Sequence, residues 1–173
     1  MRDFAHRLQI DSIRDGDRLD LTADEDERAG IATRLDLLAL DRLEAHVMLH
    51  REGKTVKCDG RVKAQLAQAC IASGEPVPAA IDERFSLAFV PAPKIDAPEA
   101  EVELGGDDLD TMFHDGQAID LGLAIADTLA LALNPYPRGP AADEALKAAG
   151  VLSEAEAGPF AALAKLKGGS TSE

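Results

Sequence analysis

The stretch from Leu43 to Leu66 alternates apolar and polar residues on both sides of a short turn that contains Gly53. Every second residue is small or apolar from Leu43 to Leu49, and again from Val56 to Leu66. A period of two places these residues on one face of a strand. Two long strands joined by a short turn pair antiparallel, so the sequence predicts a hairpin with one face on the core.

The flanking segments continue this pattern. Residues 4–10 and 77–91 also alternate, and Ser73-Gly74-Glu75-Pro76 predicts a turn before the second of them. Consecutive strands joined by short turns predict an antiparallel meander.

Two further segments are helical in pattern. Thr22 and Glu25 fit a capping box, which predicts a helix that begins there. Residues 118–135 are apolar on nearly every side and predict a helix within the core that ends at Asn134-Pro135.

We therefore expect an α+β fold, built as a twisted antiparallel β-sheet or open barrel with a few packed helices, an acidic loop and a short C-terminal helical segment. A chain of 173 residues suits one core. We place the α+β domain at residues 1–138, with an acidic excursion at about 91–116. Residues 139–173 are expected to be a C-terminal extension with short helices and a polar tail.

Negative charge is concentrated in the middle of the chain. The net charge is −14, and the stretch from Ile95 to Pro137 holds 10 acidic residues and no Lys or Arg. This balance disfavours broad, salt-driven binding to nucleic acid and suits a basic protein partner. The alternative is a solvated acidic loop that aids solubility. The N-terminus lacks a signal-peptide pattern and no apolar run is long enough to span a bilayer, so we expect a cytoplasmic protein.

The sequence offers little that points to catalysis. Motifs for phosphate loops, hydrolase elbows and zinc proteases are absent. Cys70 and Ser73 form C-x-x-S, one sulfur short of a zinc knuckle. Cys58 and Cys70 have no identified base beside them, which favours small buried thiols. His46 and His50 lack further ligands at a suitable spacing. We expect no catalytic residue, no metal and no cofactor, and hence not an enzyme.

One strand face is basic. It carries Lys57, Arg61 and Lys63, with Arg51 and Lys54 at the adjoining turn. Every second residue of a strand advances about 7 Å, a spacing that can follow phosphates. Aromatic residues for stacking on bases are missing from this face. Lys57, Arg61 and Lys63 are candidate contacts for RNA or for a protein partner, and an ordinary solvated face is the alternative.

Three blocks of sequence occur in a characteristic order. The first, VKCDGRVKAQLAQACIASGEPVPAAIDERFSLAFVP, has a Gly in a strand, a Cys at a turn and a strand that ends near a proline. The second, AIDLGLAIADTLALALNPYPRGP, has a Leu- and Ala-rich helix with a proline-rich exit, and the third is GPFAALAKLKG. Together they resemble the YceD family of large ribosomal RNA subunit accumulation proteins, and Asn-Pro-Tyr-Pro-Arg is most similar to its alphaproteobacterial branch. The matching residues expected to have structural roles are Cys70, Gly74, Glu75, Pro76, Phe85, Asp120, Leu121, Pro135, Tyr136, Pro137 and Arg138.

The resemblance implies a non-enzymatic bacterial factor that supports synthesis, processing or stability of large-subunit (23S) ribosomal RNA during ribosome biogenesis. The alternative is an acidic adaptor or chaperone for a basic ribosomal protein, with indirect effects on RNA. The implied partner is large-subunit ribosomal RNA or a ribosomal protein, and neither DNA nor a membrane. Many members carry C-x-x-C at the turn, so Ser73 removes any zinc-based mechanism here. The oligomeric state stays open.

The C-terminal block carries an apolar stripe. Phe160, Leu163 and Leu166 recur at three-residue spacing, with Lys165 and Lys167 beside them. Such a stripe on a helical turn can dock on a partner or fold back onto its own domain. The sequence favours neither.

Overall fold

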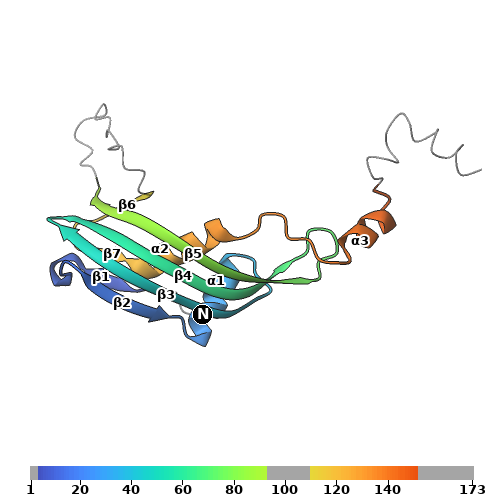
Figure 1. Cartoon of the computed structure of the whole chain (residues 1–173), viewed down its shortest axis with the longest axis horizontal. Coiled ribbons are helices and arrows are strands. Elements are labelled where there is room, and N and C mark those ends of the chain that lie inside the picture. Colours follow the sequence, from blue (N-terminus) through green and yellow to red (C-terminus); the bar gives the residue numbers. More distant parts are fainter. Residues whose placement is uncertain (1–3, 93–109, 152–173) are drawn as a thin grey trace, which may run out of the picture. The chain divides into compact units, whose positions relative to one another are not determined.

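The computed structural model describes residues 4–92 and 110–151 (Figure 1). The chain divides into two compact units. The first, Met1–Gln68 with Pro78–Pro135, is called the sheet unit here, and the second, Ala69–Val77 with Tyr136–Glu173, is called the turn unit. The elements in chain order are β1 (Arg7–Gln9), the 3-10 helix η1 (Ile10–Ser12), β2 (Asp17–Thr22), α1 (Glu25–Arg34), β3 (Ala39–Glu52), β4 (Thr55–Ala69), β5 (Pro76–Pro91), β6 (Asp110–His114), β7 (Ala118–Asp120), α2 (Leu121–Ala132) and α3 (Ala142–Ala148).

The predicted hairpin is the centre of the sheet. β3 and β4 pair antiparallel from Glu52 opposite Thr55 to Ala39 opposite Ala67, with one irregularity between Leu40 and Arg42. The two-residue turn begins at Gly53, whose φ of +66° lies in the left-handed region. Glycine reaches this region without steric cost, which explains its place in the turn.

The sheet has the strand order β2-β3-β4-β5-β6, and a separate two-stranded sheet joins β1 to β7. The predicted α+β class is therefore confirmed, and the sheet is not closed into a barrel. The prediction of a wholly antiparallel sheet is wrong, because β6 runs parallel to β5. A parallel pair needs a long connection, and the chain supplies one between Pro91 and Asp110. β6 itself lies within the stretch expected to be an acidic excursion.

One face of the sheet carries the core. The alternating residues of β3 and β4 are buried as their period predicts, with Leu43, Leu49 and Val62 fully enclosed. α1 contributes Ile31 to the same cluster, and α2 contributes Ile125. Gly60 leaves room on this face for the ring of Phe85 from the neighbouring strand, because a Cβ at Gly60 would lie 2.7 Å from Cε1 of that ring. We call the opposite, solvent-facing side of β2–β5 the outer face.

The start of α1 differs from the prediction. The capping box uses Asp24 and Glu27, whose side chains and backbone N–H groups exchange hydrogen bonds of 2.9 Å. Thr22 still belongs to β2, where it pairs with Glu44. The predicted box at Thr22 and Glu25 is therefore wrong by two residues, because strand pairing continues through Thr22.

α2 is enclosed on most sides, as its composition predicts. Its cap is Asp120, whose carboxylate accepts a hydrogen bond of 3.1 Å from the Leu123 N–H. Leu121, Ile125 and Leu129 are fully buried. The helix ends at Ala132, two residues before Asn134. No helix in residues 4–92 or 110–151 is both long and apolar enough to cross a bilayer.

Candidate functional site

The outer face of the sheet holds all three candidate contact residues. Lys57, Arg61 and Lys63 lie on β4 with their side chains on the side opposite the buried Val56, Val62 and Ala64. The basic residues of this face in β2–β5 are Arg18, Arg42, Lys57, Arg61, Lys63 and Arg84. The acidic ones include Asp20, Glu44, Glu52, Asp59 and Asp82. The face is nearly balanced in charge, while the whole chain is at −14.

Three of these six cations form an ion pair with an acidic residue of the described chain. The Arg61 guanidinium binds both carboxylate oxygens of Asp82, with the Nη2–Oδ2 distance at 2.8 Å. This hydrogen bonding holds the pKa of Asp82 below its usual value and raises the pKa of Arg61. The Lys57 ammonium lies 3.7 Å from Glu52. Exposed pairs of this kind contribute little to stability, so a phosphate can replace the carboxylate at small cost.

Lys63 differs from the other two. It stands opposite Glu44 in the strand register. Glu44 is held by Arg42 through two hydrogen bonds of 2.7 Å, which lower the pKa of the Glu44 carboxyl. Within the described part of the chain Lys63 makes no ion pair. It is therefore the cation of this trio that is most available to a ligand.

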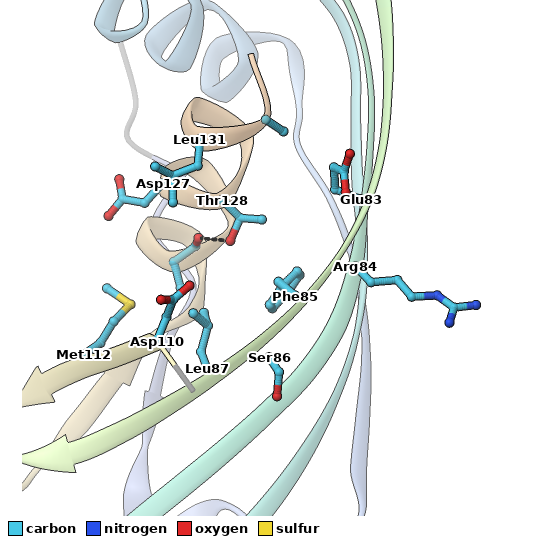
Figure 2. Close-up of a pocket in the computed structure, with 12 residues that line it drawn as sticks. Glu83, Arg84, Phe85, Ser86, Leu87, Asp110, Met112, Asp127, Thr128 and Leu131 are labelled. Atoms are coloured by element: carbon cyan, nitrogen blue, oxygen red, sulfur yellow. Dashed lines mark hydrogen bonds between the residues drawn. The ribbon is translucent and has the colours of Figure 1, made fainter. Parts of the chain in front are cut away.

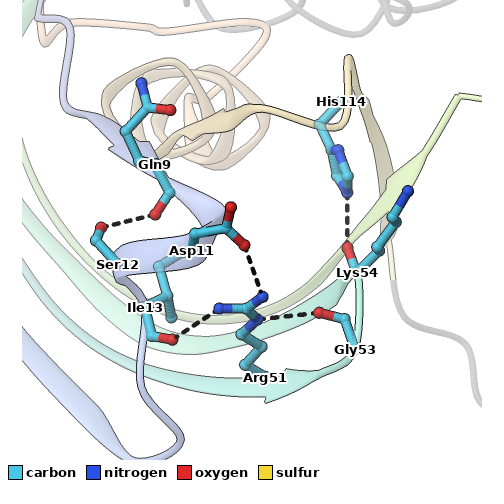
Figure 3. Close-up of polar contacts among 8 residues, drawn as sticks. All are labelled: Gln9, Asp11, Ser12, Ile13, Arg51, Gly53, Lys54 and His114. Atoms are coloured by element: carbon cyan, nitrogen blue, oxygen red, sulfur yellow. Dashed lines mark hydrogen bonds and ion pairs between the residues drawn. The ribbon is translucent and has the colours of Figure 1, made fainter.

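Arg51 does not belong to the outer face. Figure 3 shows its guanidinium turned toward the segment that follows β1, where it donates to Asp11 at 3.0 Å and to the Ile13 carbonyl at 3.4 Å. It also donates to the Gly53 carbonyl at 3.0 Å. The sequence predicts Arg51 at the turn that adjoins the basic face, and the structure places it near the end of β3, two residues before that turn. Arg51 is two residues after the buried Leu49, so the alternation of side chains along β3 places it on the inner side of the sheet.

The two strand histidines have separate partners. His46 Nδ1 lies 2.5 Å from the Asp20 carboxylate, and His50 Nδ1 lies 3.0 Å from that of Asp15. Among the residues that the structure describes, no group of three His, Cys, Asp or Glu side chains could hold a metal ion.

Cys70 is the centre of the turn unit. Its thiol is 3 % exposed and accepts a hydrogen bond of 3.4 Å from the Gly139 N–H. The backbone closes around it, because the Cys70 carbonyl accepts from Gly74 at 2.8 Å and the Cys70 N–H donates to Glu75 at 2.8 Å. Gly74 has a φ of +74°, which the reversal of the chain requires.

Hydrogen-bond donors converge on the Cys70 sulfur. The Gly139 N–H, the Ser73 hydroxyl and the N–H groups of Ser73 and Ala72 together lower the pKa of the thiol to about 6. Cys58 is the opposite case, since burial and the Asp59 charge raise the pKa of its thiol to about 12. Both cysteines are free. Ser73, which takes the place of a second Cys in the turn, thus helps to lower the pKa of the first.

The proline-rich exit belongs partly to the same unit. The Pro137 carbonyl accepts a hydrogen bond of 2.9 Å from the Ile71 N–H, and Arg138 pairs with Asp143 at 2.7 Å. Tyr136 is 71 % exposed. The C-terminal candidates Phe160, Leu163 and Leu166 lie outside the described residues.

Both the turn around Cys70 and the helix capped by Asp120 fall within one family match. The family model for the large ribosomal RNA subunit accumulation protein YceD matches residues 58–167, well over half of the chain. The chain belongs to the YceD family. No curated protein matches it, and no solved structure does.

Membership in the YceD family covers the residues that the sequence resemblance singled out. The match begins at Cys58 on β4 and includes the turn around Cys70, the strand of Phe85 and all of α2. It also includes Lys63 and Arg61 on the outer face. Among the described residues, the YceD match thus contains the buried Cys70, most of the apolar face of α2 and part of the solvent-facing outer face.

Proposed function

We propose that this protein is a non-enzymatic factor that supports the accumulation of large-subunit ribosomal RNA during ribosome biogenesis in the bacterial cytoplasm. The YceD family match over residues 58–167 is the observation that carries the proposal. The factor acts by binding, either to the RNA or to one of its proteins.

Depletion of the protein tests this role. The expected result is a fall in the ratio of large-subunit to small-subunit ribosomal RNA and a loss of large subunits in sedimentation profiles. Restoration by the wild-type gene is the control. Normal RNA ratios and normal profiles after depletion would rule the proposal out. A purified protein that shortens precursor RNA would instead contradict the non-enzymatic part.

The outer face is the proposed RNA contact. Replacing Lys57, Arg61 and Lys63 together with Gln removes three cations from exposed positions. The slope of log affinity for a ribosomal RNA fragment against log salt is expected to fall by about two to three. The matched control replaces Arg7, Arg14 and Arg34 with Gln, which changes net charge equally within the sheet unit but outside strands β2–β5. Equal loss in both triple variants would argue against a contact at β4.

The second candidate is an adaptor or chaperone for a basic ribosomal protein. Net charge of −14 favours such a partner through complementarity. Capture on the tagged protein from nuclease-treated lysate separates the two candidates. A ribosomal protein retained after nuclease treatment supports the adaptor, and recovery that requires RNA supports direct RNA contact.

A further inference from the structure

The sheet unit contains a groove of about 640 Å³ between β5 and α2. Residues Glu83 to Leu87 form one wall, and α2 from Ala124 to Ala132 forms the other. The start of β6 adds Asp110 and Met112 (Figure 2). The volume is typical of a binding groove, and none of the roles described above uses it.

The wall from β5 is a strand edge. All five consecutive residues from Glu83 to Leu87 line the groove. Successive side chains of a strand point to opposite faces, so such a run lines a groove only if the strand presents its edge to it. β6 pairs with β5 from Leu87 onward. In the described part of the chain no strand pairs with this side of β5 at Glu83–Ser86. Its N–H and C=O groups there can accept an added strand.

The groove offers apolar contacts beside this edge. Figure 2 shows Phe85 directed from β5 toward α2. Leu131 of α2 is 83 % exposed at the groove, and Leu87 and Met112 add apolar surface from the strands. An exposed Leu beside a partly buried aromatic ring suits one aliphatic side chain of a ligand.

The charges that line the groove are mainly acidic. Glu83 and Asp110 form no ion pair within the described residues, and Asp127 pairs with Arg34 at 3.2 Å. Arg84 extends from the strand away from α2 (Figure 2). An acidic groove repels phosphate groups and attracts Lys and Arg, so the charge favours a basic peptide over RNA.

We propose that this groove takes an extended, basic segment of a partner protein. The segment adds as a strand to the free edge of β5 at Glu83–Ser86. It places an apolar side chain against Phe85 and Leu131, and sets Lys or Arg beside Glu83 and Asp110. This proposal gives the adaptor candidate a binding site. It rests on the proposed function only for the statement that the partner is a ribosomal protein.

Binding of a defined peptide to the full-length protein tests the groove. The probe is a fluorescently labelled peptide of alternating Lys and Val, and its matched control has Glu in place of every Lys. The Lys peptide is expected to bind and to slow amide hydrogen exchange at Glu83–Ser86. The E83Q/D110N double variant should weaken binding about fivefold, which corresponds to about 1 kcal/mol for the two exposed pairs together. L131Q is expected to weaken it by a similar factor, and D41N, on β3, to leave it unchanged.

Four results would overturn the proposal. Equal binding of the Glu and Lys peptides would show that the acidic residues of the groove do not select a basic ligand. Slowed amide exchange at β4 instead of β5 would show that the peptide does not pair with the edge of β5. Slowed exchange at Glu83–Ser86 caused by a single-stranded RNA would assign the groove to RNA. Slow amide exchange at Glu83–Ser86 in the absence of peptide would mean that the groove is already occupied. If that protection is independent of protein concentration, the occupant is another part of this chain, and if it rises with concentration, the occupant is a second copy. None of these outcomes depends on ribosomal RNA levels after depletion, so the two proposals fail separately.

Discussion

At the residue scale, Cys70 shows how hydrogen-bond donors lower the pKa of a thiol in a turn. Its sulfur is enclosed by donors from Ala72, Ser73 and Gly139, which favour the thiolate. The turn therefore places a negative charge in the turn unit near neutral pH.

The first prediction concerns the titration of this thiol. Ultraviolet absorbance of the thiolate in the folded protein should rise with a midpoint near the pKa of about 6. This step should vanish in Cys70→Ser and persist in Cys58→Ser, because burial raises the pKa of Cys58 to about 12. A single step near the ordinary thiol pKa would show that the donors do not stabilise the thiolate.

The same shift makes stability depend on pH. The folded-state pKa of Cys70 lies below the ordinary value of 9.0, so the thiolate contributes to stability fully above about pH 9. That contribution declines as the pH falls toward 6 and is absent below it. The stability difference between wild type and Cys70→Ser should follow this course in denaturant unfolding. A difference that does not vary between pH 5 and 9 would contradict it.

His114 is the second residue whose environment decides its role. It is 6 % exposed, and its Nε2 donates to the Lys54 carbonyl at 2.9 Å (Figure 3). Its Nδ1 accepts a hydrogen bond of 2.9 Å from the Gly116 N–H. Both nitrogens are thus used, and the ring joins the end of β6 to the turn between β3 and β4.

We expect His114→Ala to lower the free energy of unfolding by about 1–3 kcal/mol, because it removes a buried ring together with two part-buried hydrogen bonds to the backbone. His50→Ala is the matched control, and it should cost less than about 1 kcal/mol because its partner Asp15 is exposed. Chemical denaturation of both variants gives the comparison. Equal losses would argue against a structural role for His114.

At the element scale, α2 depends on close contact with the N-terminal segment. The Leu121 N–H donates to the His6 carbonyl at 3.0 Å, and a Cβ at Gly122 would lie 2.7 Å from the Phe4 carbonyl carbon. Gly122 therefore allows the backbone of Phe4 to pass directly over the first turn of the helix.

Gly122→Ala should consequently destabilise the protein, although alanine favours a helix over glycine by about 1 kcal/mol. The added methyl group displaces the Phe4 backbone, so hydrogen exchange in β1 and β7 should accelerate. Leu123→Ala, at a position 41 % exposed, is the control and should leave that exchange unchanged. A stabilised Gly122→Ala variant would show that the contact with Phe4 is dispensable.

The elements that the sequence predicted well are those in which apolar and polar residues alternate over a long stretch. The hairpin of β3 and β4 and its buried face follow from alternation alone. The capping box was misplaced because Asp24-x-x-Glu27 and Thr22-x-x-Glu25 fit the same pattern, and only the pairing of Thr22 with Glu44 decides between them. β6 was missed because a strand of five residues is too short to show a clear alternation of apolar and polar side chains. Its pairing with β5 depends on tertiary packing.

The groove also had a signal in the sequence. Glu83 interrupts the apolar set formed by Ile81, Phe85 and Leu87, a charge where alternation predicts a core residue. Such an interruption marks the place where the inner face is not covered. The ion pairs of the outer face, by contrast, depend on cross-strand neighbours such as Arg61 and Asp82, whose register the sequence alone does not fix.

At the scale of the whole molecule, the outer face differs in charge from the chain as a whole. That face is nearly balanced while the chain as a whole carries −14, so an RNA contact at β4 has to overcome repulsion from the rest of the protein. Salt weakens this repulsion and also weakens the attraction between phosphates and the cations of the outer face, so the sign of the salt slope shows which of the two is larger. The salt titration proposed above for Lys57, Arg61 and Lys63 measures this balance directly.

The order of the elements along the chain has a consequence for synthesis. The strands β2 to β5 are complete at Pro91, but α2, which covers their apolar face, ends only at Ala132. At about 5–20 residues per second a ribosome needs roughly 2–8 s to make the stretch between them. During that interval the nascent chain exposes an unfinished core, and we expect chaperones to crosslink to chains arrested before α2 far more than to chains arrested after it. Equal crosslinking would contradict this. A YceD protein with this order of elements thus passes through its most aggregation-prone stage while still attached to a ribosome.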